Sequence, residues 1–304
     1  MQFKFHTLDV FTTRKFAGNP LAVVLDADAL STQQMQTIAG EFNLPETTFI
    51  QRPNDKANTC KMRIFTPRRE LPFAGHPTIG SAVLIAELQG LEEVRFELNA
   101  GLTPVKIKRG AGAISATLTA PVIPFACEVP LPSITETAAA LNLAASDIGF
   151  DNHFISALEG GPRFFFVPVN SSTALAESKV IEPAWSNLLG KINECAPETK
   201  TIFGAYLYTR GGEARQTAYR ARMFAPGGGI TEDPATGSAT ALLAAQLHRA
   251  EAPKDGTHIW QLEQGYEMGR PSQLQLEVDV ANNSLTAVRV AGSAVRVCEG
   301  VIAY

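Results

Sequence analysis

The chain has 304 residues, of which 45% are hydrophobic and 18% are charged, and its formal net charge is −4. This size and composition allow a large buried core and two domains, and the acidic balance argues against a nucleic-acid partner. The N-terminus has no signal-peptide pattern and no apolar run is long enough to cross a bilayer, so we expect a cytoplasmic protein without a membrane partner.

Period-two patterns in the N-terminal half predict strands at residues 3–11, 21–25, 47–50, 95–98, 103–108 and 113–119. Gly18-Asn19-Pro20 is a turn signal between the first two of these strands. Ser31 is placed to cap a helix at residues 33–42. Pro45 blocks a continuation of that helix, so Glu46 is expected in a short polar loop that enters the next strand.

The C-terminal half begins after a stretch, residues 121–132, that contains four prolines. We place the domain boundary there, giving an N-terminal half of residues 1–125 and a C-terminal half of residues 126–304, with the last strand allowed to cross to the other half. Ser133 and Glu136 form a capping-box pattern at the start of a helix. A second helix is expected around residues 184–195, and strands are expected near 152–157, 163–169, 201–224 (a hairpin), 274–280, 285–290 and 295–302.

Two similar motifs, half a chain apart, organise the sequence. Residues 63–86 read RIFTPRRELPFAGHPTIGSAVLIA, and residues 222–243 read RMFAPGGGITEDPATGSATALL. Aligning His76 with Asp233 brings the following Pro, Gly, Ser and Ala into register. Each motif ends in an almost wholly apolar helix, which is typical of a buried helix. The sequence therefore predicts an α+β fold of two pseudo-symmetric domains, each a sheet wrapped around a central buried helix, facing each other across a cleft.

The start of each buried helix is the predicted place for chemistry, because free N–H groups and the helix dipole favour an anion there. Asp233 before Pro234 is typical of an N-cap, and a purely capping role is the simpler reading. His76 is not a preferred cap and exchanges protons near neutral pH. Glu46 is a second proton-transfer candidate if it is buried, although glutamate is more often exposed.

We assign structural roles to the other polar residues of the two motifs. Glu70, Glu232 and Arg222 are expected to be solvated, and Ser238 fits a small residue that permits close packing.

The cysteines Cys60, Cys127, Cys195 and Cys298 are widely scattered, and the histidines show no metal-ligand spacing. The glycine run at 227–229 lacks the Gly-Lys-Ser/Thr of a phosphate loop. We therefore expect neither a metal nor another cofactor.

Five motifs, in order along nearly the whole chain, resemble the PhzF-type isomerases of phenazine biosynthesis, which are related to diaminopimelate epimerase. They are DVFTTRKFAGNPLAVV, ETTFI, RIFTPRRELPFAGHPTIGSA, RMFAPGGGITEDPATGSA and GYEMGRPSQL. The resemblance implies the diaminopimelate epimerase-like fold, with the site between two halves, and a homodimer. It also implies a cofactor-independent isomerisation of trans-2,3-dihydro-3-hydroxyanthranilate, in which a proton moves between ring carbons.

The resemblance assigns roles to particular residues. Glu46 would be the general acid/base, and His76 and Asp233 would bind and orient the substrate as further members of the catalytic set. The expected substrate-binding residues are Asn19, Gly75, Gly237 and Ser238. Related racemases carry a cysteine at each helix start, where this chain has Ala74 and Ala235, so a two-thiol mechanism is excluded.

Two alternatives stay open at this stage. An epimerase or racemase would use Glu46 with His76 or Asp233 as its two acid/base groups. A non-catalytic binding protein would keep the anion-holding cleft without turnover. The substrate in each case is a small carboxylate.

Overall fold

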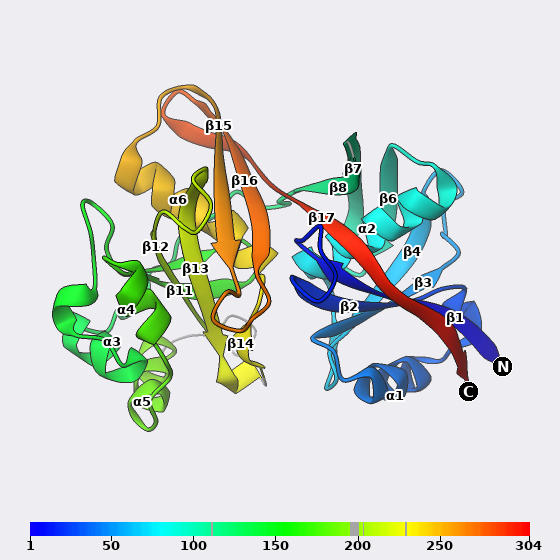
Figure 1. Ribbon diagram of the computed structural model, residues 1–304, viewed down its shortest axis with the longest axis horizontal. Coiled ribbons are helices and arrows are strands. Elements are labelled where there is room, and N and C mark those ends of the chain that lie inside the picture. The colour runs from blue at the N-terminus through cyan, green and yellow to red at the C-terminus, as the bar shows by residue number, and fades with distance from the viewer. Residues whose placement is uncertain (111, 195–200, 203, 229) are drawn as a thin grey trace. The chain divides into compact units, whose positions relative to one another are not determined.

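The computed structural model describes residues 1–110, 112–194, 201, 202, 204–228 and 230–304 (Figure 1). The chain divides into two compact units. Unit 1 comprises Met1–Thr119 and Ala291–Tyr304, and unit 2 comprises Ala120–Val290. Along the chain, the division therefore falls just before the proline-rich stretch, and the C-terminal residues return to unit 1. Within the described ranges, no helix is both long enough and apolar enough to span a membrane.

Unit 1 is a ring of strands. They are β1 (Gln2–Val10), β2 (Asn19–Val24), β3 (Glu46–Gln51), β4 (Cys60–Phe65), β5 (Glu70–Leu71), β6 (Glu93–Leu98), β7 (Gly101–Gly110), β8 (Ala113–Thr119) and the C-terminal part of β17 (Ser284–Ala303). The order of neighbours is β17, β1, β2, β3, β4, β6, β7 and β8, and β8 is also paired with β17. The pairs β2–β3 and β4–β6 are parallel. The closed ring removes free strand edges.

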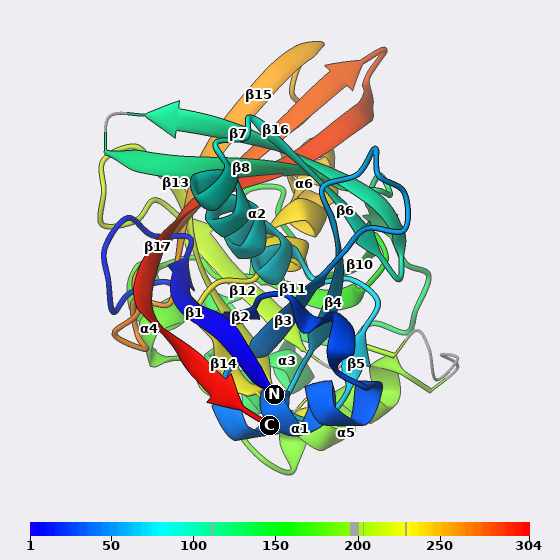
Figure 2. The ribbon, with the colours of Figure 1, turned by 90° about the vertical axis from the view of Figure 1, so that its right-hand side faces the viewer.

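The ring encloses α2 (Gly75–Gln89), which contacts β1, β2, β3, β6, β7 and β8 (Figure 2). Residues 75–86 of this helix are all buried, which confirms the predicted burial of an apolar helix on every side. The short η1 (Ala27–Ala29) and α1 (Thr32–Phe42) lie outside the ring. In the chain, they come between β2 and β3. Ser31 and Gln34 form a capping box at the start of α1, so the predicted cap is also confirmed.

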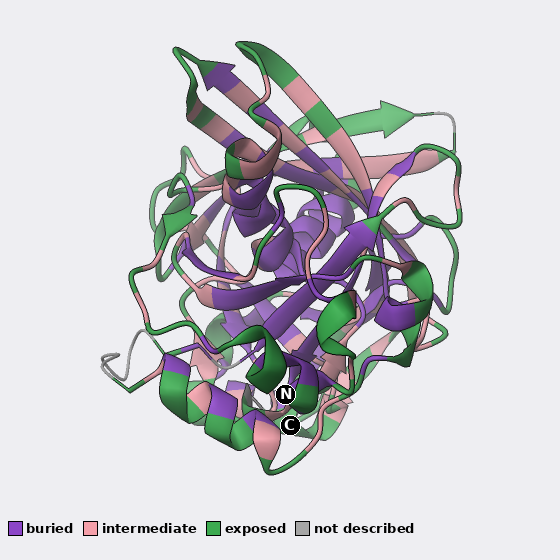
Figure 3. Ribbon diagram, turned by 90° about the vertical axis from the view of Figure 1, so that its left-hand side faces the viewer, coloured by how far each residue is buried: buried purple, intermediate pink, exposed green. Residues whose placement is uncertain are grey.

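Unit 2 repeats the scheme around α6 (Gly237–Glu251), which contacts β9, β10 and β16. Its strands are β9 (Phe125–Ala126), β10 (Ser156–Glu159), β11 (Arg163–Pro168), β12 (Ala205–Arg210), β13 (Thr217–Ala225), β14 (Ile230–Asp233), β15 (Gly256–Gln264) and β16 (Ser272–Ala281). Neighbours run β9, β10, β11, β12, β13, β15 and β16, with β14 also on β13. Five of the six residues of β11 are buried. In Figure 3, buried residues (purple) gather in helices and strands, while the connecting loops are largely exposed (green) or intermediate (pink).

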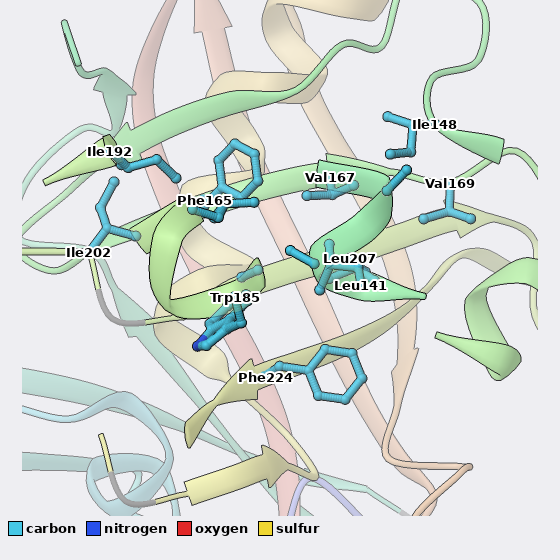
Figure 4. Packing of buried hydrophobic residues seen from close by; sticks show 14 of the residues in the cluster. Leu141, Ile148, Phe165, Val167, Val169, Trp185, Ile192, Ile202, Leu207 and Phe224 are labelled. Atoms are coloured by element: carbon cyan, nitrogen blue, oxygen red, sulfur yellow. The ribbon is translucent and has the colours of Figure 1, made fainter. Parts of the chain in front are cut away.

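The second face of these strands carries a layer of helices: α3 (Ile134–Leu141), α4 (Ser172–Glu177) and α5 (Ala184–Ile192), with the short η2 (Ala145–Asp147) and η4 (Pro226–Gly228) in the connections. Trp185 and Ile192 of α5 pack with Phe165, Val167 and Leu207 of the strands (Figure 4). Side chains alternate along a strand, so unit 2 buries its central strands between α6 and this helical layer. The α+β prediction is confirmed.

Each of the two repeated motifs contains an arginine–glutamate ion pair. Arg63 donates to both carboxylate oxygens of Glu70 at 2.7 and 2.6 Å, and Arg222 donates to both oxygens of Glu232 at 2.8 and 2.9 Å. The Arg222 side chain is only 8% exposed, so the prediction that these groups are solvated is wrong. Hydrogen bonds from Arg63 hold the pKa of Glu70 below its ordinary value. Each pair fastens the loop that leads into the buried helix.

Several predicted boundaries need correction. The strand expected near 152–157 is β10 at Ser156–Glu159, and the two strands expected at 285–290 and 295–302 are one continuous strand, β17. The helix expected around 184–195 ends at Ile192, and Cys195 lies outside the described residues. The largest error concerns the start of α6. Asp233 ends β14 and the helix begins only at Gly237, so Pro234 is not its first residue.

We expect Gly80→Ala to destabilise the protein. A Cβ atom at Gly80 would lie 2.6 Å from Val10 Cγ2 and 2.7 Å from Leu21 Cδ2, so these side chains or α2 itself would have to shift. Overpacking of this kind costs ~1–3 kcal/mol. The matched control is Gly40→Ala in α1, where the nearest atom, of Pro67, is 3.7 Å away. There, helix propensity predicts a gain of ~0.5–1 kcal/mol.

Urea unfolding of the two variants measures both changes. An equal or greater stability for Gly80→Ala than for Gly40→Ala would contradict the tight packing of α2 against β1 and β2.

Candidate active site

One end of the unit 1 ring gathers four of the predicted site residues. Asn19 begins β2 and Glu46 begins β3, and these strands are parallel with Leu21 beside Glu46, so both residues lie at the same edge. Gly75 and His76 are the first two residues of α2. The distance between His76 Nδ1 and Glu46 Oε2 is 3.2 Å. The ring therefore brings an imidazole and a carboxyl group into contact at the start of its central helix.

Burial controls the charge of His76. The His76 side chain is 6% exposed and that of Glu46 is 13% exposed. Burial lowers the pKa of His76 to about 3, and a hydrogen bond with the backbone of Pro20 acts in the opposite direction. His76 is therefore a neutral imidazole near pH 7. It carries one N–H, and its two nitrogens then have different roles.

The free ring nitrogen of His76 points to a binding function. Nε2 is buried and has no hydrogen-bond partner among the described residues. Proline has no backbone N–H, so the bond with Pro20 requires a proton on Nδ1, because Nε2 has no partner in the described chain. Nε2 then carries no proton, and His76 offers a hydrogen-bond acceptor to a ligand.

The helix start adds donors to the same place. The N-cap of α2 is Ala74, whose side chain cannot accept a hydrogen bond from the first turn. N–H groups at the start of a helix attract carboxylates and phosphates when no side chain caps them. Gly75 lets a ligand approach this backbone closely, because it has no Cβ atom.

In unit 2, the segment from Asp233 to Thr236 forms a turn that is held by a residue of another strand. Thr236 Oγ1 donates to Asp233 Oδ2 at 2.5 Å. The buried Gln264, at the end of β15, accepts from Thr236 N at 3.1 Å and donates to Asp233 O at 2.7 Å. It also donates to Thr236 Oγ1 at 3.0 Å. Gln264 thus binds the Thr236 N–H, which the side chain of Asp233 would bind if it were the N-cap. This explains why Asp233 is not the cap.

The remaining predicted residues follow this turn. Thr236 is the N-cap of α6 without a side-chain capping bond, Gly237 is the first helical residue, and Ser238 comes next. Ser238 is partly exposed, and its hydroxyl has no hydrogen bond to any described residue. Our prediction that these residues and those of unit 1 open onto one cleft stays a prediction.

Sequence reasoning missed Gln264 as a residue of the site. The sequence did contain an indication of its role, because Gln264 immediately precedes the GYEMGRPSQL motif. Gly265 explains the start of that motif: its φ is +77°, and a Cβ atom there would lie 2.6 Å from Pro234 O. For metals, the described part of the chain contains no cluster of three or more His, Cys, Asp or Glu side chains arranged to hold an ion.

Comparison with known proteins gives consistent matches over the whole chain. The family of phenazine biosynthesis-like proteins, PhzC-PhzF, matches residues 8–300. An uncharacterized isomerase of Mesorhizobium japonicum is 40% identical over 96% of both chains. The trans-2,3-dihydro-3-hydroxyanthranilate isomerase of Pseudomonas aeruginosa is 33% identical over 98% of both chains.

A solved structure supports the fold. The PhzF-family phenazine biosynthesis protein of Bacillus anthracis superimposes with a TM-score of 0.88 at 24% identity, and the match covers 100% of both chains. The family match, the sequence identities and the shared fold lead to one conclusion: the chain belongs to the PhzC-PhzF family of phenazine biosynthesis-like proteins.

Proposed function

We propose that the protein is a cofactor-independent isomerase that moves a proton within a small carboxylated, amino-acid-like or cyclic substrate. The observation that carries the proposal is the contact of 3.2 Å between the mostly buried Glu46 and the neutral His76. A positioned carboxyl group with a hydrogen-bonding partner is the equipment that general acid/base catalysis needs. Relatives named isomerases support the reaction class.

In the proposed reaction, the Glu46 carboxylate removes a proton from an activated carbon of the substrate. The electron pair of the broken C–H bond forms a new double bond, which displaces the electrons of the adjacent double bond. These electrons take the proton back from the same carboxyl group at another carbon. His76 keeps its single N–H throughout and stabilises the carboxylate through Nδ1. The N–H groups at the start of α2 would hold the substrate carboxylate.

Trans-2,3-dihydro-3-hydroxyanthranilate is the substrate we propose to test first, since it is named in the relative that is 33% identical. It offers a carboxylate for the helix start and polar groups for His76 Nε2. We further propose that Asp233, Gly237 and Ser238 of unit 2, together with Asn19 and Gly75 of unit 1, contribute to substrate binding. A homodimer remains our proposal for the assembly.

The geometry disfavours one form of the epimerase alternative. Two-base inversion needs an acid and a base on opposite faces of one carbon, each ~3–3.5 Å from it and therefore roughly 6–7 Å apart. Glu46 and His76 lie 3.2 Å apart and act from the same side. An epimerase that used Glu46 with Asp233 would still exchange the proton at a stereocentre, and a binding protein would show no turnover.

The first prediction concerns Glu46→Gln. In deuterated water with trans-2,3-dihydro-3-hydroxyanthranilate, we expect the wild type to change the absorbance and to place deuterium in the product. Glu46→Gln should lose at least ~10²-fold in rate, because an amide cannot take the proton. Glu41→Gln, which changes an exposed glutamate of α1, is the matched control and should keep wild-type activity.

Each other outcome has a definite meaning. Equal rates for Glu46→Gln and the wild type would remove Glu46 from the mechanism. Deuterium at a stereocentre with inversion and no shift of the double bond would establish the epimerase. Thermal stabilisation by the compound without turnover in any variant would favour the binding protein.

The second prediction uses the pKa of His76. It is lowered from 6.5 to about 3 on folding, so the unfolded chain binds a proton that the folded chain does not. The stability due to the neutral imidazole is therefore complete above pH ~6.5 and is lost as the pH falls toward 3. Between these limits, the wild type should lose up to ~1.4 kcal/mol more per pH unit than His76→Gln.

Urea unfolding of both proteins between neutral and mildly acidic pH measures this difference. Parallel stability curves for the wild type and His76→Gln would show that folding leaves the pKa of His76 unchanged, which would contradict its burial as a neutral imidazole.

The third prediction concerns the Asp233–Thr236 turn. Gln264→Met removes three hydrogen bonds and leaves the buried Thr236 N–H without its acceptor. We expect a loss of ~2–4 kcal/mol in the free energy of unfolding. The control is Gln261→Met on the same strand, where one partly buried bond to Gln275 is lost and the cost should stay below ~1 kcal/mol.

Activity of the folded variants separates stability from function. A lower affinity for the substrate in Gln264→Met but not in Gln261→Met would support a binding role of the turn, whereas equal stabilities would contradict the hydrogen-bond network.

A further inference from the structure

Unit 1 contains a groove of about 690 Å³ that is separate from the candidate active site. It is lined by β1 and the loop after it, the C-terminal half of α2, the tip of the β7–β8 hairpin and the central part of β17. None of Asn19, Glu46, Gly75 and His76 lines it. The proposed function therefore gives this groove no role.

A β-bulge shapes one wall of the groove. Thr7 of β1 pairs with Cys298 of β17, and the next residue of β1, Leu8, pairs with Arg296. Val297, between Arg296 and Cys298, is therefore the extra residue of the bulge. A bulge of this kind bends the strand and redirects the neighbouring side chains. Arg296, Val297 and Cys298 all line the groove. The bulge therefore forms part of the wall of the groove.

His6 brings an unpaired polar atom into the same wall. Its side chain is 9% exposed, and Nδ1 lies 3.6 Å from Glu299 Oε2 without a hydrogen-bond partner among the described residues. Burial, followed by the nearby Arg296, lowers the pKa of the imidazole. A buried polar atom without a protein partner is normally satisfied by water or by a ligand.

The positively charged side chains that line the groove outnumber the negatively charged ones. Arg296 lies 3.1 Å from Glu87 and 3.9 Å from Glu299, which accounts for both carboxylates of the lining. Arg109 donates to the carbonyl groups of Ala86 and Leu91 at the end of α2, and in the described chain it forms no ion pair. Lys15 likewise has no acidic partner among the described residues. Two cations therefore face the groove without a counterion.

We propose that this groove is a second binding site, for a small organic anion with an apolar body. The carboxylate or phosphate of the ligand lies between Lys15, Arg109 and His6, and its apolar part covers Ile114 and Val297, which also line the groove and are partly exposed. Arg and Lys donors with a neighbouring apolar surface are the usual means of binding such molecules.

Cys298 supplies a local readout, because it is an exposed free cysteine in the lining, whereas Cys127 is partly buried in unit 2. The full-length protein is alkylated with iodoacetamide, and the rate at each cysteine is followed by mass spectrometry of its peptide. Benzoate and phenyl phosphate are the anionic probes, and benzamide is the neutral one. At ten times its dissociation constant, a bound anion should slow the alkylation of Cys298 about tenfold and leave that of Cys127 unchanged.

Variants test the charges. Lys15→Gln and Arg109→Gln should each raise the half-protecting anion concentration by up to ~5-fold, as expected for loss of a partly solvated ion pair. The control, Lys56→Gln, changes an exposed lysine of unit 1 outside the groove and should have no effect. Stronger protection by benzoate assigns a carboxylate, and stronger protection by phenyl phosphate assigns a phosphate ester.

Three results would overturn the proposal. These are equal protection by benzamide, no protection by either anion, and protection that Lys15→Gln and Arg109→Gln leave unchanged. Cys60, which is buried in unit 1, should remain unreactive in each case, which shows that unit 1 of the variant remains folded.

Discussion

The constraint on which the structure depends is the burial of a whole helix within a layer of strands. All residues from Gly75 to Ala86 of α2 are buried, including His76. Such a helix has no polar face, so its ionisable group must find its partner at the helix end, and Glu46 at the start of β3 fills that position. The Glu46–His76 contact, which we propose as the proton-transfer pair, therefore arises from the same packing that stabilises unit 1. Changing the packing of α2, as at Gly80, would also change the place of His76.

The two repeated motifs keep one interaction and vary another. Both contain a bidentate arginine–glutamate pair, Arg63 with Glu70 and Arg222 with Glu232, which fixes the loop before the helix. The helix starts differ, because α2 begins one residue before His76, whereas α6 begins four residues after Asp233. As a result, unit 1 presents a neutral imidazole inside a helical turn, and unit 2 presents a carboxylate in a turn that Gln264 holds. The pseudo-symmetric motifs therefore supply two different chemical groups.

The sequence predicted the features that depend on neighbouring residues and missed those that depend on distant ones. The capping boxes at Ser31 and Ser133 involve residues three positions apart, and both are present. The predicted Asp233 cap was wrong because Gln264, 31 residues further on, accepts from the Thr236 N–H that the cap would bind, and also donates to Asp233 O. Likewise, Glu70 and Glu232 were assigned to solvent because no local pattern indicates their arginine partners. The contact of Glu46 with His76, 30 positions apart, also required the fold, and the family resemblance alone had connected the two residues.

The low pKa of His76 limits what the candidate site can do. An imidazole with a pKa of about 3 does not hold a positive charge near pH 7, so it cannot accept the substrate proton and store it. Within this pair, the proton taken from carbon has to remain on Glu46 until it is returned. A base that keeps its proton and returns it from the same side suits the transfer of hydrogen along one face of a molecule. Inversion at a single carbon needs a second group on the other face. The burial of His76 is therefore the physical reason to favour an isomerase over a Glu46–His76 epimerase.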